Sequence, residues 1–238
     1  MADQTSGAVA VIPARGGSKR LPRKNLLAFR ARPMIAWTID AARASGVFDA
    51  VYVTTENKEI GQVAGDAGAT VLKRDVALAA DDVPLVAVLE DTLRQLGREA
   101  ERACLLMPNC PLRNADDIAA SANSFAKSEM DVLMSVVAYD WRRPQWALRD
   151  DGGRLTPVGW REPPKPTDVP ERLVCPSGAI RWVWRECFLA DPCFYPDTLA
   201  GFALPWYRGV DIDDAEDLEF AECVAFAMDR GFTFGAAA

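Results

Sequence analysis

The stretch AVAVIPARGGSKRLPRKN, residues 8–25, decides the fold of this chain. Its first part, residues 8–12, is a short apolar run that is typical of a buried parallel strand. Residues 15–25 then form a loop with two glycines, five cations and no acid. Glycines let the backbone approach a ligand, and clustered Arg and Lys neutralise phosphate oxygens through charge-assisted hydrogen bonds. The stretch therefore predicts a site for a strongly anionic ligand, for which a nucleoside triphosphate is the natural candidate.

A solvated basic turn is the alternative interpretation, and the flanking sequence argues against it. A helical pattern follows the loop at residues 33–39, and a strand, a glycine-basic loop and a helix form the first unit of a nucleotide-binding α/β domain. Further strands are predicted at residues 51–55, 70–72, 103–107, 131–137 and 178–184, and helices at residues 34–45, 59–67, 83–96, 114–127 and 215–228. This alternation predicts an α/β fold with three layers (α/β/α) around a mostly parallel sheet.

Composition excludes several classes of function. The 238 residues, half of them hydrophobic, can bury the core of one domain. A net charge of −7 argues against general binding to nucleic acid or to an anionic membrane surface. The absence of histidine, with six cysteines and no C-x-x-C pair, argues against zinc sites and Ser-His-Asp triads. No run approaches the ~20 apolar residues of a membrane span, and a cytoplasmic protein is expected.

Prolines and tryptophans gather between residue 139 and about residue 176. Neither a helix nor a central strand tolerates that proline density. We therefore assign residues 139–185 to an arm inserted into a main domain formed by residues 1–138 and 186–238. Tryptophan is favoured at protein interfaces, so the arm is expected to dock on a second subunit. A long loop folded on its own domain is the alternative.

A second candidate site is the segment VDID, residues 210–213. In a strand the side chains alternate, so Asp211 and Asp213 would share one face. Magnesium prefers one or two carboxylates together with substrate phosphates and water, which suits a triphosphate held nearby. Capping of the last helix is the alternative role for acids in this region, and we assign that role to Asp214, Glu216 and Asp217.

Two motifs, IPARGGSKRLPRKN at residues 12–25 and VDID at residues 210–213, closely resemble those of the acylneuraminate cytidylyltransferases, also called CMP-sialic acid synthetases. Supporting matches over nearly the whole chain are LKR at 72–74, LAAD at 78–81, LLMP at 105–108, PLR at 111–113 and PSGAI at 176–180. The resemblance implies a Rossmann-like nucleotidyltransferase fold and, usually, a homodimer. It also implies transfer of CMP from CTP to the anomeric hydroxyl of a nine-carbon 2-keto sugar acid, with magnesium and release of pyrophosphate.

The resemblance also implies roles for individual residues. The nucleotide would be bound by Ala14, Arg15, Gly16, Gly17, Ser18, Lys19, Lys24, Asn25, Arg74 and Asp81. The sugar would be bound by Met107, Lys165, Ser177, Gly178, Arg181, Phe194 and Tyr195. The metal would be held by Asp211 and Asp213, and catalysis would involve Arg15, Lys24 and Asp211. In a chain without histidine, the base for an in-line displacement at the α-phosphorus would be a carboxylate, a lysine or metal-bound water, and Asp211 is the candidate.

Departures from the family pattern fall mostly at the sugar. Where the family commonly reads QPTSPLR, this chain has MPNCPLR at residues 107–113, and where it reads RPNGAIY, this chain has CPSGAIR at residues 175–181. Exchanging hydrogen-bonding groups in a polar pocket changes which sugar is accepted. The hypothesis is a sialic-acid relative of the legionaminic or pseudaminic type as substrate. The alternatives are the eight-carbon 2-keto sugar acid of lipopolysaccharide and a nucleotide-binding protein with impaired catalysis.

Overall fold

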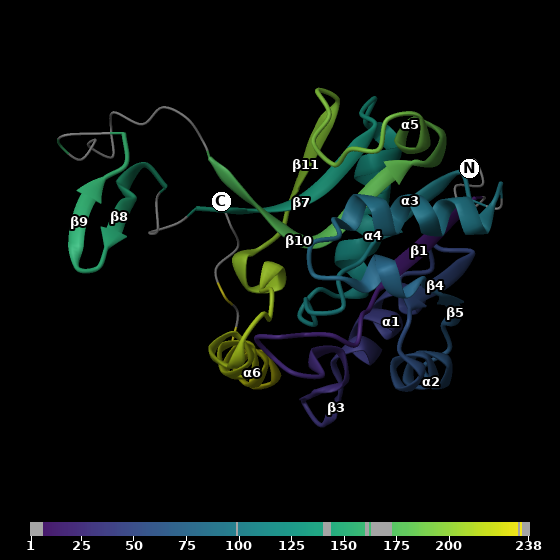
Figure 1. The fold of residues 1–238 in the computed structure, drawn as a ribbon, viewed down its shortest axis with the longest axis horizontal. Helices are drawn as coiled ribbons and strands as arrows, with labels where there is room; N and C mark the ends of the chain where they lie inside the picture. Colours follow the sequence, from purple (N-terminus) through teal and green to yellow (C-terminus); the bar gives the residue numbers. More distant parts are fainter. Residues whose placement is uncertain are drawn as a thin grey trace.

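The computed structural model describes residues 7–98, 100–139, 144–159, 162, 173–232 and 234. A seven-stranded sheet runs through the molecule in the order β11-β7-β10-β6-β1-β4-β5 (Figure 1). Its strands are β1 (Ala8–Pro13), β4 (Ala50–Thr55), β5 (Thr70–Lys73), β6 (Arg102–Leu105), β7 (Val132–Ala138), β10 (Val174–Trp184) and β11 (Leu199–Ala203). Neighbouring strands are parallel except at β10, which is antiparallel to both β6 and β7. The predicted mostly parallel α/β sheet is confirmed.

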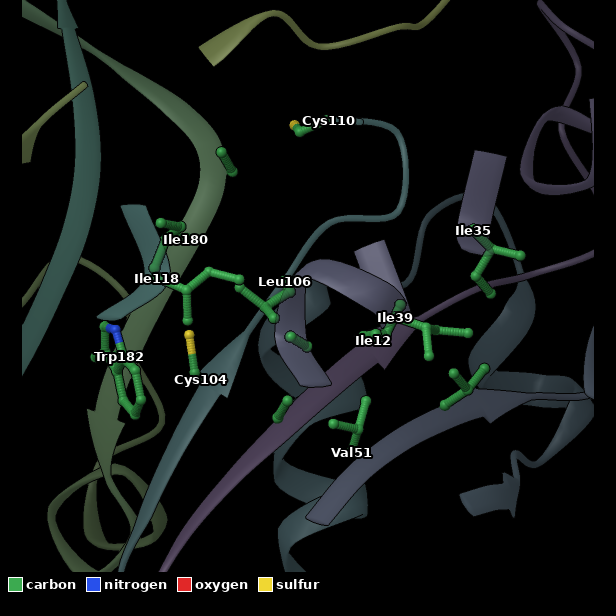
Figure 2. Close-up of a cluster of buried hydrophobic side chains, with 14 of the residues drawn as sticks. Ile12, Ile35, Ile39, Val51, Cys104, Leu106, Cys110, Ile118, Ile180 and Trp182 are labelled. Atoms are coloured by element: carbon green, nitrogen blue, oxygen red, sulfur yellow. The ribbon is translucent and has the colours of Figure 1, made fainter. Parts of the chain in front are cut away.

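Helices cover both faces of the sheet, as the three-layer prediction requires. One face packs against α1 (Met34–Ala44), α2 (Lys58–Asp66) and α4 (Ala115–Lys127), and the other against α3 (Leu85–Leu96) and α5 (Arg185–Ala190). Strand β1 is buried at every residue because Ala10 and Ile12 belong to the first layer and Val9 and Val11 to the second. Figure 2 shows the first layer, into which side chains from β1, β4, β6, β10, α1 and α4 project.

Trp182 of β10 ties the sheet to α4. Its side chain is 1% exposed and stacks between Phe48 and Phe125, with ring centroids 5.4 and 6.0 Å away. Its indole N–H donates to Ser121 Oγ at 2.9 Å, so the one polar atom of this buried ring is satisfied. This packing fixes β10 in the centre of the sheet, beside the carboxyl end of β6.

The last helix, α6 (Ala215–Asp229), lies next to the loop that follows β1 and has its own apolar cluster, which includes Phe29 and Ile212. A capping box starts the helix: Asp214 accepts from the backbone N–H of Asp217, and Asp217 accepts from that of Asp214. The capping role predicted for these two residues is confirmed, and Glu216 lies in the same first turn. None of the helices within the described ranges is long and apolar enough to cross a membrane.

The remaining elements are short. They are β2 (Ala28–Phe29), β3 (Arg32–Pro33), β8 (Leu148–Asp151), β9 (Arg154–Pro157) and the 3-10 turns η1 (Lys24–Leu26), η2 (Val76–Ala79), η3 (Pro144–Trp146) and η5 (Trp206–Gly209). Strands β8 and β9 form a hairpin that stands away from the main sheet, beyond the ends of β7 and β10 (Figure 1).

Two predicted boundaries differ from the structure. The arm assigned to residues 139–185 includes β10, whose residues 181–184 pair with β6 inside the main sheet. The reason is burial: Ile180 and Trp182 face one apolar layer and Val183 the other, so this segment is core. Residues 210–213, predicted as a strand, join no sheet. The backbone N–H of Ile212 bonds instead to the carbonyl of Asn109, in the loop after β6.

Candidate active site

The basic loop follows β1 directly and is anchored through its first glycine. The backbone N–H of Gly16 donates to Glu56 Oε1 at 2.6 Å, and Glu56 lies at the end of β4. A Cβ on Gly16 would lie 2.5 Å from Asn57 Nδ2, and Asn57 caps α2 through its side chain. Only glycine lets the loop approach α2 this closely. Ala14, buried at the end of β1, donates its N–H to the carbonyl of Thr54.

The loop cations are paired with acids from distant parts of the chain. Arg15 and Lys19 contact Asp81 at 2.9 and 2.5 Å. Hydrogen bonding from Lys19, with its charge and that of Arg15, holds the pKa of Asp81 below its usual range. Lys24 and Arg20 contact the two oxygens of Asp213 at 2.8 and 2.5 Å. Each acid therefore lies where an anionic ligand would compete for the same cations.

Four further residues predicted at the nucleotide differ in their surroundings. Asn25 is buried and donates to the carbonyl of Arg15 at 3.0 Å, while its Oδ1 has no partner within the described residues. Arg74 is 3% exposed and donates to Thr54, and burial lowers its pKa. Gly17 and Ser18 form the outer part of the loop, and Gly17 has open space beside it.

The aspartates of the second motif lie beside the basic loop. Asn109, in the loop after β6, donates through Nδ2 to Asp211 Oδ1 and lies 3.4 Å from Asp213 Oδ1. Burial, with the charge of Asp213 adding to it, raises the pKa of Asp211 to about 6. Burial also acts to raise the pKa of Asp213, but the contacts with Lys24 and Arg20 outweigh it and lower that pKa. The two carboxylates therefore differ in how readily they bind a proton.

Three of the residues predicted at the sugar, Met107, Ser177 and Gly178, lie on β10 or in the loop after β6. The carbonyl of Met107 accepts from Thr38 and Arg113, and its side chain packs against the first apolar layer. Gly178 has a φ of +73°, which favours glycine, and a Cβ there would lie 3.8 Å from Asp211 Oδ2. Ser177 is buried, and its hydroxyl lies 2.7 Å from that of Ser135, so in this arrangement its oxygen bonds within the sheet.

Two of the other predicted sugar residues, Arg181 and Phe194, contact each other. Arg181 lies on β10 with its guanidinium carbon 5.1 Å from the centre of the Phe194 ring. Phe194 is 6% exposed and packs in the second apolar layer, whereas Tyr195 is 61% exposed. The two aromatic residues therefore do not present a common face. Lys165 lies outside the described residues.

Sequence reasoning missed Asn109 and Glu56. Asn109 is 3% exposed, and its amide bridges Asp211 and the carbonyl of Ile212, 102 and 103 residues away. Because Nδ2 faces three oxygens, the orientation of this amide is set by its surroundings. No local pattern signals either residue. Glu56 follows β4 directly and Asn109 lies in the loop after β6, so both are beyond the carboxyl ends of parallel strands, where ligands bind in this class of fold.

A comparison with known proteins gives the family. The family model described as cytidylyltransferase matches residues 9–144, more than half of the chain. The chain belongs to the cytidylyltransferase family. The match runs from β1, through the basic loop and β6, to the region beyond β7, so it includes most of the residues predicted at the nucleotide.

Two named enzymes and one solved structure are similar to this chain. A pseudaminic acid cytidylyltransferase of Campylobacter jejuni is 27% identical over 218 residues, covering 90% of this chain and 94% of that enzyme. An N-acylneuraminate cytidylyltransferase of Streptococcus agalactiae is 28% identical over 213 residues, and the match covers 88% of this chain but only 51% of that protein. The solved structure of a CMP:2-keto-3-deoxy-manno-octonic acid synthetase complexed with CTP has a TM-score of 0.71 and 19% identity, over 95% of this chain and 100% of that one. This cytidylyltransferase therefore shares the fold of that synthetase over 95% of its length.

Proposed function

We propose that this chain transfers CMP from CTP to the anomeric hydroxyl of a nine-carbon 2-keto sugar acid of the sialic-acid type and releases pyrophosphate. One observation carries the proposal: Lys24 of the basic loop contacts Asp213 of the VDID segment at 2.8 Å, 189 residues away. A set of phosphate-binding cations and a pair of carboxylates thus share one site. Membership of the cytidylyltransferase family supports cytidine as the nucleoside.

The nucleotide would be bound by the loop after β1. Arg15, Lys19 and Lys24 would exchange their contacts with Asp81 and Asp213 for contacts with the phosphates. The buried and unpartnered Oδ1 of Asn25 would accept a hydrogen bond from the bound nucleotide. Charge neutralisation and positioning would supply most of the rate enhancement, as in other phosphoryl transfers.

A divalent cation, proposed to be Mg²⁺, suits the carboxylate pair. Asp211 and Asp213 lie close enough that the charge of Asp213 raises the pKa of Asp211, and a cation between them would remove this repulsion. Within the described residues no three His, Cys, Asp or Glu side chains gather to hold a metal. Phosphate oxygens and water would therefore complete its coordination. When bound, the cation would neutralise negative charge on the transferring phosphoryl group.

The chemical step proposed is an in-line displacement. The anomeric hydroxyl oxygen forms a bond to the α-phosphorus, and the bond from that phosphorus to the β-phosphate oxygen breaks. The proton of the hydroxyl passes to a base, for which Asp211 is the candidate because its raised pKa of about 6 lies near neutral pH. Pyrophosphate leaves with the electron pair of the broken bond.

The identity of the sugar acid is proposed from the relatives and from the residues at β10. A pseudaminic acid cytidylyltransferase matches over nearly its whole length, which supports a relative of sialic acid. The structural similarity to the octonic acid synthetase favours the eight-carbon 2-keto sugar acid as the second candidate. Met107 and Arg181 give this side of the site a different chemistry from the family pattern.

A homodimer is proposed as the assembly. The hairpin of β8 and β9 stands away from the sheet and exposes Leu148 and Leu155, which are 47% and 58% exposed. Exposed leucines on a hairpin that stands away from the sheet favour a partner surface.

The deciding experiment is pyrophosphate release from CTP and Mg²⁺ with a panel of nine-carbon and eight-carbon 2-keto sugar acids. Turnover is expected with a relative of sialic acid, and a strict preference for the eight-carbon acid would select the second candidate. Absence of turnover with every acid, together with tight CTP binding, would instead identify a nucleotide-binding protein. Asp211→Ala serves as the matched inactive variant, and its expected result is loss of turnover with the fold intact by circular dichroism.

A further inference from the structure

Arg181 is a partly buried cation without an acidic partner. Its Nε is enclosed and makes no hydrogen bond, and the guanidinium forms no ion pair with any carboxylate of the described residues. Removing a cation from water without a compensating anion is costly. A ligand that supplies an anion would remove this cost.

The position of Arg181 directs it toward the candidate site. On β10 it lies opposite Leu105, the last residue of β6, and Met134 of β7. Ligands of this fold class bind beyond the carboxyl ends of the strands, and β6 ends here. Gly178, on the same strand, would carry a Cβ 3.8 Å from Asp211 Oδ2, so this part of β10 lies beside that carboxylate.

The guanidinium plane is supported from one side by an aromatic ring. The centre of the Phe194 ring lies 5.1 Å from the guanidinium carbon, and Phe194 is itself held against Phe188 at 5.4 Å in the second apolar layer. This stacking restricts the side chain and leaves its edge donors for a ligand. Arginine presents those donors as a planar fork that matches a carboxylate.

Other cations around the site are paired with an acid or enclosed by protein. Arg15 and Lys19 contact Asp81, and Arg20 and Lys24 contact Asp213. Arg113 also forms no ion pair within the described residues, and its Nε and one terminal nitrogen make no hydrogen bond, but it is only 2% exposed and donates to the carbonyl of Ala179 at 3.0 Å. Arg181 therefore differs from these residues in combining access to the site with the lack of any anionic partner within the described ranges.

We propose that the Arg181 guanidinium binds the carboxylate of the sugar acid and selects acids over neutral sugars. The inference rests on the proposed function and names the substrate group that Arg181 recognises. In a 2-keto sugar acid the carboxylate and the anomeric hydroxyl are attached to the same carbon. An arginine that holds the carboxylate therefore also orients the attacking oxygen, beside Asp211. A contact to the α-phosphate of CTP is the competing use of the same cation.

The test combines two variants with two substrates. Arg181→Gln and Arg181→Lys are compared with wild type on the sugar acid that is turned over and on its C1 carboxamide, which keeps the anomeric hydroxyl. Loss of a charge-assisted pair predicts that Arg181→Gln raises the KM for the acid by about 10- to 100-fold, while the KM for CTP changes less than about twofold. Arg181→Lys is expected to lie between the two.

Comparing the acid with the carboxamide distinguishes a role of Arg181 in binding the carboxylate from a purely structural role. Wild type should prefer the acid over the carboxamide by the same 10- to 100-fold, and Arg181→Gln should lose this preference. Arg185→Gln is the matched control, because Arg185 also has a buried Nε without a hydrogen bond but lies at the far end of β10, beyond Trp184. It should keep the wild-type preference. The wild-type comparison needs no variant to fold.

Three outcomes would overturn the inference: an equal loss by Arg181→Gln on both substrates, a rise confined to the KM for CTP, or equal use of acid and carboxamide by wild type. If wild type turns over no acid, calorimetry with CTP and then with the acids in the presence of a non-hydrolysable CTP analogue separates the two failures. If an acid binds wild type and not Arg181→Gln, the role of Arg181 is supported, although the proposed CMP transfer is not. Binding of CTP but of no acid overturns the role of Arg181 as well.

Discussion

Asn109 connects the two halves of the site through one buried side chain. Its side-chain amide donates to Asp211 and to the carbonyl of Ile212, and its backbone carbonyl accepts from the backbone N–H of Ile212 at 2.9 Å. These contacts hold residues 210–213 extended where no neighbouring strand supports them. The placement of the carboxylates thus depends on a residue in a different loop.

Asn109→Ala is expected to loosen this segment. Removing the amide leaves a buried carbonyl and one oxygen of Asp211 without a donor, so the free energy of unfolding should fall by roughly 1–3 kcal/mol, and the apparent affinity for Mg²⁺ should fall with it. Urea denaturation and Mg²⁺ titration of turnover measure the two effects. Asn114→Ala is the control, because it removes the cap of α4 at a cost of roughly 1 kcal/mol. Equal loss of Mg²⁺ affinity in both variants would contradict the role of Asn109.

The buried carboxylate of Asp211 is predicted to lower the free energy of unfolding at neutral pH, where it is ionised. Its pKa in the folded protein, about 6, exceeds the value of about 3.9 for an unperturbed Asp. The folded state therefore binds the proton more tightly, and stability falls as pH rises from 4 through 6. Without divalent cations, Asp211→Asn should raise Tm by about 2–4 °C above pH 7 and should lose this advantage near pH 4. Differential scanning calorimetry at both values tests this, and a constant difference would contradict it.

At the scale of single residues, the sequence predicted that the loop forms an anion site. It did not predict which residues the loop side chains contact. Two glycines and five cations after a buried strand indicate an anion site from local sequence alone. That Lys19 would contact Asp81, or that Ser177 would bond to Ser135, depends on how segments 42 or more residues apart pack together.

The basic loop, as an element, is held by internal carboxylates. Asp213 is the clearest case, because both of its oxygens contact loop cations. A divalent cation that approaches the ligand-free protein must therefore displace two tethered positive charges. Phosphates that attract Lys24 and Arg20 would release Asp213, so nucleotide and cation are expected to bind together.

Arg20→Gln tests this coupling. Removing one of the two cations at Asp213 should strengthen binding of Mn²⁺ to the CTP-free protein by about two- to fivefold, the size expected for one exposed ion pair. Electron paramagnetic resonance of free Mn²⁺ gives the affinity. Arg23→Gln is the matched control, because Arg23 pairs with Glu59 and does not contact Asp213. Weaker Mn²⁺ binding by Arg20→Gln would show that Arg20 does not compete with the cation.

Elements with a strong local pattern were predictable, and short or isolated ones were not. β1 is apolar at every position because both of its faces are covered. β11 lies at the edge of the sheet, pairs only with β7 and contains Gly201, so its five residues resemble a loop. α5 has six residues and no side-chain cap. The strand predicted at residues 209–213 was wrong because an extended backbone can be held by a side-chain amide as well as by a sheet.

At the scale of the molecule, the hairpin of β8 and β9 forms a sheet of its own, separate from the seven-stranded sheet. Replacing residues 144–158 by a short Gly-Ser linker should leave the seven-stranded sheet and CTP binding intact, because no strand of the sheet pairs with the hairpin. If the hairpin forms a subunit contact, the variant should be a monomer where the full chain is a dimer. Light scattering at micromolar concentration gives the mass. An unchanged dimer would move the subunit contact elsewhere.

The reversed direction of β10 has a further consequence for how this protein can change over evolution. Because β7 and β10 are antiparallel neighbours, the loop that connects Ala138 to Val174 joins adjacent points of the sheet. Doubling the length of such a loop costs only about 0.6 kcal/mol of closure entropy. Insertions, deletions or wholesale replacement there leave the register of seven strands untouched. Changes in this loop can therefore accumulate while the seven-stranded sheet stays the same.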